Sequence, residues 1–125
     1  MKQTVTLTIT SLLTMLLASF HVTDDIARGL DPARPASLIL VPILVVWLYA
    51  TLVLAERRSG YVILILGSLL GAVIPVLHFN GKRIGEIAAS SGGFFFIWTL
   101  FAVGVTALFS LILAVQGLWR LRSDR

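Results

Sequence analysis

The sequence predicts an all-α integral membrane protein, in which a single domain of 125 residues forms a bundle of four transmembrane helices. Composition is the first reason. Hydrophobic residues make up 58% of the chain and charged residues only 13%, whereas a soluble domain carries roughly 25% charged residues. Segregation is the second reason, because the apolar residues fall into four blocks long enough to cross a hydrocarbon core about 30 Å thick. A chain of this kind needs lipid as its solvent.

The predicted membrane segments are 4–22, 38–55, 61–79 and 94–118, and none of them contains a charged residue. We expect the first segment to be retained, because its exit, LLASFHVTDD, lacks the small-x-small pattern of a signal-peptidase site. The second segment is the most apolar, and we expect lipid to cover much of its surface. The aromatic run at 94–98 is typical of an anchor at the membrane–water interface.

Basic residues predict the orientation of these segments. The tight ERRSG hairpin and the two ends form one side, and the longer loops TDDIARGLDPARPAS and NGKRIGEIAASSGG form the other. The first side carries six basic residues, namely Lys2, Arg57, Arg58, Arg120, Arg122 and Arg125. The second side carries four, namely Arg28, Arg34, Lys82 and Arg83. Because cytoplasmic loops are enriched in Lys and Arg, both termini are predicted to be cytoplasmic.

This distribution also predicts the partners and the location. The basic residues flank apolar blocks instead of forming one basic face, so the lipid bilayer, and not nucleic acid, is the expected partner. We expect a multi-pass protein of the cell membrane, of the bacterial inner-membrane type. A homo-oligomer and a complex with another membrane protein both stay open.

Small and hydroxyl residues predict how the helices pack, since such residues mark helix contacts in lipid. The first segment presents Thr6, Thr10, Thr14 and Ala18 on one face, followed by His21. The third presents Gly60, Gly67, Gly71 and His78. The fourth presents Thr99, Thr106, Ala107, Ser110, Ala114 and Gly117. We expect these three stripes to face inward together.

Two of the stripes end at the only histidines of the chain. His21 lies 19 residues after Lys2, and His78 lies 20 residues after Arg58. If both segments cross the bilayer in the same direction, the two imidazoles arrive at the same depth. The candidate metal ligands are therefore His21, Asp25 and His78, and the further candidate ligand-binding residues are Asp24, Asn80 and Glu86.

Several interpretations of this extracytoplasmic cluster stay open. In the first, the histidines are separate interfacial caps, while Asp24 and Asp25 solvate the helix end and pair with Arg28. In the second, the cluster binds a divalent transition metal such as zinc, iron, copper or manganese. In the third, His21 and His78 are the axial ligands of a b-type haem. Binding of a substrate or a proton without a cofactor is the fourth.

The sequence limits the class of function. It has no cysteine, which excludes disulfides and thiolate metal sites, and it has neither a GxSxG nor an HExxH motif. The expected role is a ligand-binding or accessory membrane protein. One alternative is a metal-dependent enzyme at the outer leaflet, with Asp24 or Glu86 as the base. Another is a small transporter or channel with a water-lined path along the threonines of the first segment.

Labelling of single cysteines tests the predicted orientation, because the chain has no natural cysteine to interfere. An impermeant thiol reagent applied to intact cells should label Ala33→Cys and Ala89→Cys but not Ser123→Cys. The reverse pattern would place the histidine cluster on the cytoplasmic side.

Overall fold

The computed structural model describes residues 2–30, 34–81 and 83–123, and within these ranges the chain forms helices and no strand. The helices are α1 (Lys2–Ala27), α2 (Arg34–Leu52), α3 (Arg58–Phe79), α4 (Ile84–Ala89) and α5 (Gly93–Ser123). By length and apolar composition α1, α3 and α5 could each cross a membrane, whereas the apolar part of α2, Leu38–Leu52, is shorter. The all-helical prediction is confirmed, and the three long apolar helices are consistent with a multi-pass membrane protein. A fourth crossing, by α2, stays a prediction.

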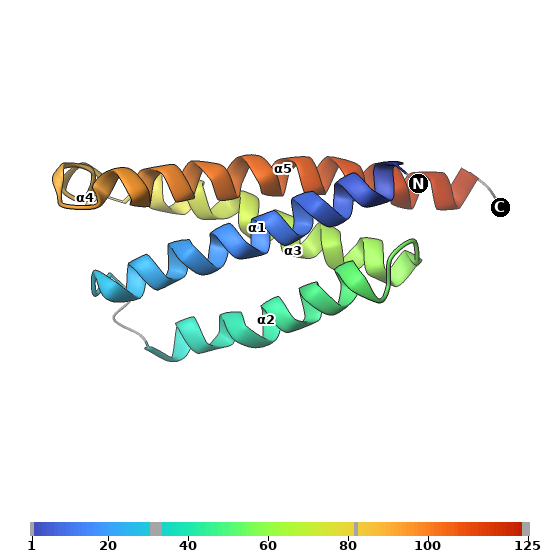
Figure 1. Cartoon of the computed structure of the whole chain (residues 1–125), viewed down its shortest axis with the longest axis horizontal. Helices are drawn as coiled ribbons and strands as arrows, with labels where there is room; N and C mark the ends of the chain where they lie inside the picture. The colour runs from blue at the N-terminus through green and yellow to red at the C-terminus, as the bar shows by residue number, and fades with distance from the viewer. Residues whose placement is uncertain (1, 31–33, 82, 124–125) are drawn as a thin grey trace.

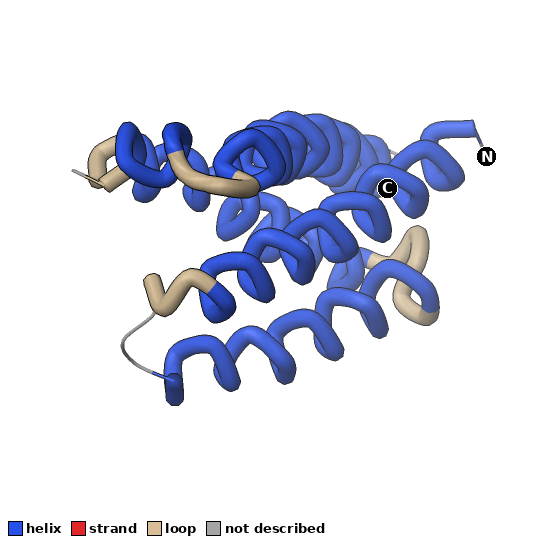
Figure 2. Tube along the Cα trace, turned by 60° about the vertical axis from the view of Figure 1, so that its left-hand side comes forward, coloured by secondary structure: helices blue, strands red, loops and turns tan. Residues whose placement is uncertain are grey.

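The long helices form a bundle in which α5 packs along both α3 and α1. The helix α2 packs against α3 and α1, on the side of the bundle away from α5 (Figures 1 and 2). The start of α1, the end of α5 and the α2–α3 connection lie at one end of the bundle (Figure 1). The short helix α4 lies at the other end, to which α1 and α3 both run.

Helix α2 ends at Leu52, three residues before the predicted end of the second segment at residue 55, so the connection to α3 begins earlier than predicted. Residues 53–57 form turns, in which Glu56 adopts a left-handed backbone with φ of 63°. A Cβ atom at Gly60 would collide with the backbone carbonyl oxygen of Leu54. The chain reverses direction between Leu54 and Gly60. Because glycine has no side chain, the backbones at these two residues can lie in contact.

A glycine cap ends α1 and fixes its last turn. The Gly29 amide donates to the carbonyl of Ile26 at 3.1 Å, and the Leu30 amide donates to the carbonyl of Asp25 at 3.0 Å. With φ of 65° at Gly29, this is a Schellman cap, which satisfies carbonyls that would otherwise have no partner. Helix α1 thus continues well past the apolar segment, and Asp25 belongs to its last turn.

The sequence predicts a loop through NGKRIGEIAASSGG, and this prediction is wrong for Ile84–Ala89, which form helix α4. The helix has only six residues and no buried ones. Such a helix is marginal by itself, so local sequence patterns carry little signal for it. In the structure, α4 packs against α5.

Close packing at Gly71 joins three helices. A Cβ atom placed on Gly71 would lie 2.9 Å from the Cβ of Ala107 on α5 and 3.3 Å from the Cγ2 of Thr14 on α1. Nearby, Gly67 lies directly against the Trp47 ring of α2. The predicted role of the glycine stripe in close helix approach is confirmed.

The predicted inward stripe of α1 is wrong at its first position, because Thr6 is exposed and Thr10 only half-buried. Their hydroxyls donate to backbone carbonyls of α1 itself, those of Lys2 and Leu7, and so need no partner helix. Thr14, later in the same stripe, is fully buried, and so is the neighbouring Ser11.

A closed hydrogen-bond circuit joins Ser11 to α2. The Trp47 indole donates to the Ser11 hydroxyl at 2.9 Å, and that hydroxyl lies 2.9 Å from the hydroxyl of Thr51. The Thr51 hydroxyl in turn donates to the carbonyl of Trp47 at 2.8 Å. Each polar group is satisfied inside the protein, as the interior of a membrane bundle demands.

The outer surface of the bundle is apolar, as a lipid-facing surface should be. On α2 the exposed large side chains include Leu38, Ile39, Val41, Val45 and Val46. In the predicted aromatic anchor, Phe94 and Trp98 are exposed, but Phe96 is completely buried. The exposed Phe94 and Trp98 are consistent with contact with a bilayer, whereas Phe96 lies in the interior of the bundle.

Replacement of Gly71 tests the three-helix contact. Gly71→Leu should lower the stability of the protein in detergent by about 1–3 kcal/mol or more, since the new side chain overlaps Ala107 and Thr14. The matched control is Gly85→Leu, because a Cβ atom at Gly85 meets open space. Leu70→Ala, at a residue 54% exposed, should also be mild. Equal thermal stability of the Gly71 and Gly85 variants would show that α1, α3 and α5 do not meet at Gly71.

Candidate functional site

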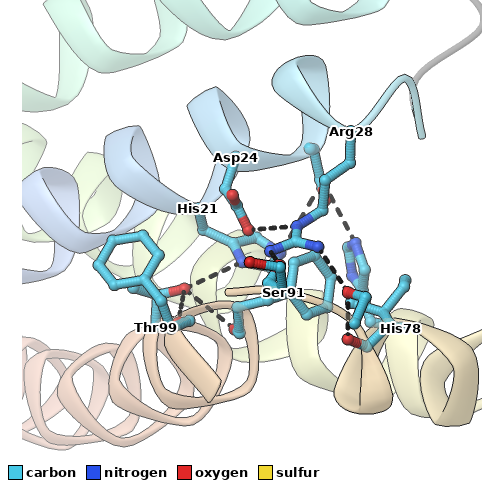
Figure 3. A network of polar contacts seen from close by, with 11 residues as sticks. His21, Asp24, Arg28, His78, Ser91 and Thr99 are labelled. Carbon is cyan, nitrogen blue, oxygen red and sulfur yellow. Dashed lines mark hydrogen bonds and ion pairs between the residues drawn. The ribbon is translucent and has the colours of Figure 1, made fainter. Parts of the chain in front are cut away.

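Three candidate residues meet at the end of the bundle that carries α4. His21 and Asp25 lie one turn apart on α1, and His78 of α3 contacts Asp25. Figure 3 shows His21 and His78 on their two helices. One ligand atom from each residue can be chosen so that all three lie within 4.8 Å of one another. The imidazole centroids are 4.8 Å apart, with the rings edge to face. The predicted meeting of the two histidines is confirmed, while their role as metal ligands stays a prediction.

The hydrogen bond of His78 fixes which ring nitrogen carries its proton. Its Nδ1 lies 2.9 Å from the backbone carbonyl oxygen of Ile74. A carbonyl oxygen can only accept, so Nδ1 must carry a hydrogen and donate it. In the neutral ring the lone pair is then on Nε2, which lies 3.3 Å from Oδ2 of Asp25. With a neutral ring, two electron-rich atoms would face each other, and a proton or a metal ion between them removes this repulsion.

The surroundings of His21 lead to the same arrangement. Its Nδ1 lies 3.4 Å from the Thr99 hydroxyl, which is itself 3.0 Å from the backbone carbonyl oxygens of Phe95 and Phe96. The single hydroxyl hydrogen of Thr99 is used on those carbonyls, so Thr99 accepts from Nδ1–H of His21. The lone pair of His21 is then also on Nε2, 3.8 Å from Oδ2 of Asp25.

Burial makes this arrangement costly unless something compensates for it. His21 is completely buried, and its Nε2 has no hydrogen-bond partner among the described residues. The Oδ1 atom of Asp25 is also buried without a partner there. Unpartnered polar atoms of this kind each cost about 1–3 kcal/mol. The two imidazole nitrogens and the carboxylate thus form a set of electron-pair donors that a cation would satisfy.

Phe96 fixes the orientation of both rings. Its ring centroid lies 4.8 Å from that of His21 and 5.8 Å from that of His78. Phe96 is completely buried, so its ring covers the imidazoles on the side that faces α5. Neither imidazole can turn freely while Phe96 and the Nδ1 hydrogen bonds are in place.

Arg28 connects the end of α1 to the segment before α5. Its guanidinium donates to Asp24 at 2.8 Å, to the Ser90 hydroxyl at 2.9 Å and to the Ser91 carbonyl at 3.2 Å. The guanidinium carbon also lies 5.7 Å from the centroid of the Phe96 ring. Figure 3 shows this network beside the histidines. Asp24 thus pairs with Arg28, whereas Asp25 is the carboxylate that faces the imidazoles.

The other predicted site residues lie outside the cluster. Asp24 forms an ion pair with Arg28, the pairing expected if these acids solvate the helix end. Asn80 is exposed at the end of α3, and its side-chain amide donates to the backbone carbonyl of Val76. Glu86 is exposed on α4. The structure therefore brings together His21, Asp25 and His78 but not Asp24, Asn80 and Glu86.

Sequence reasoning missed two residues that shape the site, Thr99 and Phe96. The sequence predicts that Thr99 lies on the inward stripe of its helix, but no sequence pattern links it to His21, which lies 78 positions earlier in the chain. Phe96 was grouped with the aromatic anchor. The signal that could have separated Phe96 from its neighbours is spacing, because it precedes Thr99 by three residues on the same helical face.

A haem between the two histidines does not fit this geometry. Axial imidazoles approach a haem iron from opposite faces of a macrocycle. Here the rings touch edge to face at 4.8 Å, and Phe96 packs against both. No porphyrin can enter that contact without separating α1 from α3.

Comparison of the chain with protein-family models, with curated proteins and with solved structures gave no match.

Proposed function

We propose that this small helical membrane protein binds a divalent transition-metal ion between α1 and α3, with His21, Asp25 and His78 as the ligands. One observation carries the proposal. The Nε2 atoms of both imidazoles face the same carboxylate oxygen of Asp25, while both Nδ1 atoms lie within hydrogen-bond distance of other partners, the Thr99 hydroxyl and the Ile74 carbonyl. A cation between these atoms turns three mutually repulsive groups into ligands.

The separations support a small ion. For bonds of about 2.1 Å, the ligands of a tetrahedral ion lie about 3.4 Å apart. The Asp25 oxygen is 3.3 Å from Nε2 of His78 and 3.8 Å from Nε2 of His21. The three ligand atoms lie within 4.8 Å of one another, so the two imidazole nitrogens would also have to close to about 3.4 Å to complete the coordination.

The surroundings also match those of known metal sites. A histidine ligand usually donates its other ring N–H to a carbonyl, a carboxylate or water, which fixes the ring and raises its basicity. Here Ile74 and Thr99 accept those hydrogens. Asp25 lies in the last turn of α1, where the helix dipole disfavours a negative charge, so a bound cation would also stabilise the helix end.

The ligand set limits the identity of the metal. Two imidazoles and one carboxylate suit Zn²⁺ and also Fe²⁺, while calcium and magnesium prefer oxygen ligands throughout. Three protein ligands leave at least one coordination position for water or another molecule. This arrangement supports the ligand-binding or accessory role expected from the sequence.

The alternative functions have less support. For a metal-dependent enzyme, the two expected bases are poorly placed, since Asp24 is paired with Arg28 and Glu86 is exposed on α4. For a transporter, the threonine path along α1 is interrupted at Thr6, which faces outward. A proton on His78 would satisfy Asp25, but it would leave Nε2 of His21 without a partner.

The orientation completes the proposal. With both termini in the cytoplasm, as the Lys and Arg distribution predicts, the metal would be bound at the extracytoplasmic face of the cell membrane. This placement assumes that α2 provides a fourth crossing.

Metal binding by purified protein tests the proposed function. The full chain in lipid nanodiscs should bind about one Zn²⁺, measured by calorimetry and elemental analysis. Asp25→Asn should weaken the binding at least about tenfold, because the substitution keeps the shape of the side chain but removes the anionic ligand. Asp24→Asn is the matched control, with the same loss of charge at a residue that faces Arg28.

Two results would contradict the proposal. One is a protein that takes up no Zn²⁺, Fe²⁺ or Mn²⁺ in nanodiscs. The other is equal loss of affinity in the Asp24 and Asp25 variants, since that would mean that the acids act only through general charge.

A further inference from the structure

An open cleft of about 460 Å³ lies directly beside the His/Asp cluster. It is bounded by the C-terminal ends of α1 and α3 and by α4. Asp25 and His78 contribute to its wall, so the cleft and the cluster share two residues. An ion bound by these two residues would face the cleft as well as the bundle.

The remainder of the wall has two chemical parts. Four aliphatic side chains, those of Leu30, Leu77, Ile84 and Ile87, form most of its surface. Arg83 supplies a guanidinium group at the start of α4. A ligand in this cleft would therefore meet a metal ion and an arginine as positive groups, with hydrocarbon surface around them.

We propose that the cleft binds an anionic amphiphile, a phosphate or carboxylate with an attached hydrocarbon chain. The proposal rests on the proposed metal site. The anionic group occupies the open coordination position of the metal and pairs with the Arg83 guanidinium, which suits phosphate and carboxylate oxygens. The hydrocarbon chain lies against the leucine and isoleucine side chains.

The apolar wall favours an amphiphile over a free inorganic anion. Ligand pockets of roughly 300–1,000 Å³ with mainly apolar walls and a few polar groups are typical of sites for organic molecules. The cleft also lies at the ends of α1 and α3, which are long and apolar enough to cross a membrane, so in a bilayer it would lie near the lipid headgroups. A molecule that approaches from the membrane could enter with its headgroup toward the metal.

Cobalt substitution gives a test with two separate readouts. The full chain in phosphatidylcholine nanodiscs is loaded with Co²⁺, whose visible spectrum reports the coordination of the metal. Hexyl phosphate is then titrated and should change that spectrum. Inorganic phosphate is titrated in parallel and should bind roughly 100-fold more weakly, as expected if about four methylenes are buried on the aliphatic wall.

A pair of arginine variants tests the second positive group. Arg83→Gln should weaken hexyl phosphate binding about tenfold while the Co²⁺ spectrum without ligand stays unchanged. Arg57→Gln is the control, because Arg57 lies at the opposite end of the bundle, beside α3 and the end of α5. Equal effects of the two substitutions would overturn the assignment of Arg83.

The outcomes separate this inference from the proposed function. A protein that shows no Co²⁺ spectrum lacks the metal site, and both proposals fail. A Co²⁺ spectrum that hexyl phosphate does not change overturns the amphiphile site alone. Equal affinity for inorganic phosphate and hexyl phosphate also overturns it, because the aliphatic wall would then contribute nothing.

Discussion

Close approach of α1, α3 and α5 at Gly71 is the constraint on which the His/Asp cluster depends. Thr14 on α1 lies against Gly71 on α3, and seven residues further along each helix stand His21 and His78. Seven residues are about two helical turns. Because both helices run toward the same end of the bundle, the register set at Gly71 brings the imidazoles together. A larger residue at Gly71 would separate the helices and move the histidines apart.

Most other buried polar side chains in the described part of the bundle have a hydrogen-bond partner. Thr14 donates to the carbonyl of Thr10, and the Ser11–Thr51–Trp47 circuit is closed on itself. Buried hydroxyls at Ser68 and Ser110 are the other side-chain atoms without partners in the described part of the chain. A neutral hydroxyl costs far less to bury than a carboxylate facing two lone pairs. With both histidines neutral, the largest unmet electrostatic demand among the described residues would therefore be at Asp25, where the proposed cation binds.

The sequence predicts the helices and the register of the site because both depend on local periodicity. Uninterrupted apolar blocks mark α1, α3 and α5. On α3, Gly71 marks the contact with α5 and α1, and Gly67 marks the contact with α2. The convergence of His21 and His78 follows from their matched distances to Lys2 and Arg58. Threonine predicts helix–helix contacts less well than glycine does, because the hydroxyl of Thr6 or Thr10 can donate to a carbonyl of its own helix and then needs no partner on another helix. The spacing of Phe96 and Thr99 places both on one helical face, but no local pattern links either residue to His21. Helix α4, with six residues, is too short to show a periodic pattern.

The most direct test of the account concerns the two ring nitrogens of each histidine. With only two histidines in the chain, a ¹⁵N nuclear magnetic resonance spectrum of histidine-labelled, zinc-loaded protein in nanodiscs resolves each ring. The account predicts that both imidazoles keep a proton on Nδ1 and that both Nε2 signals shift to the metal-bound range. A proton on Nε2 of either ring, unchanged by Zn²⁺, would contradict it.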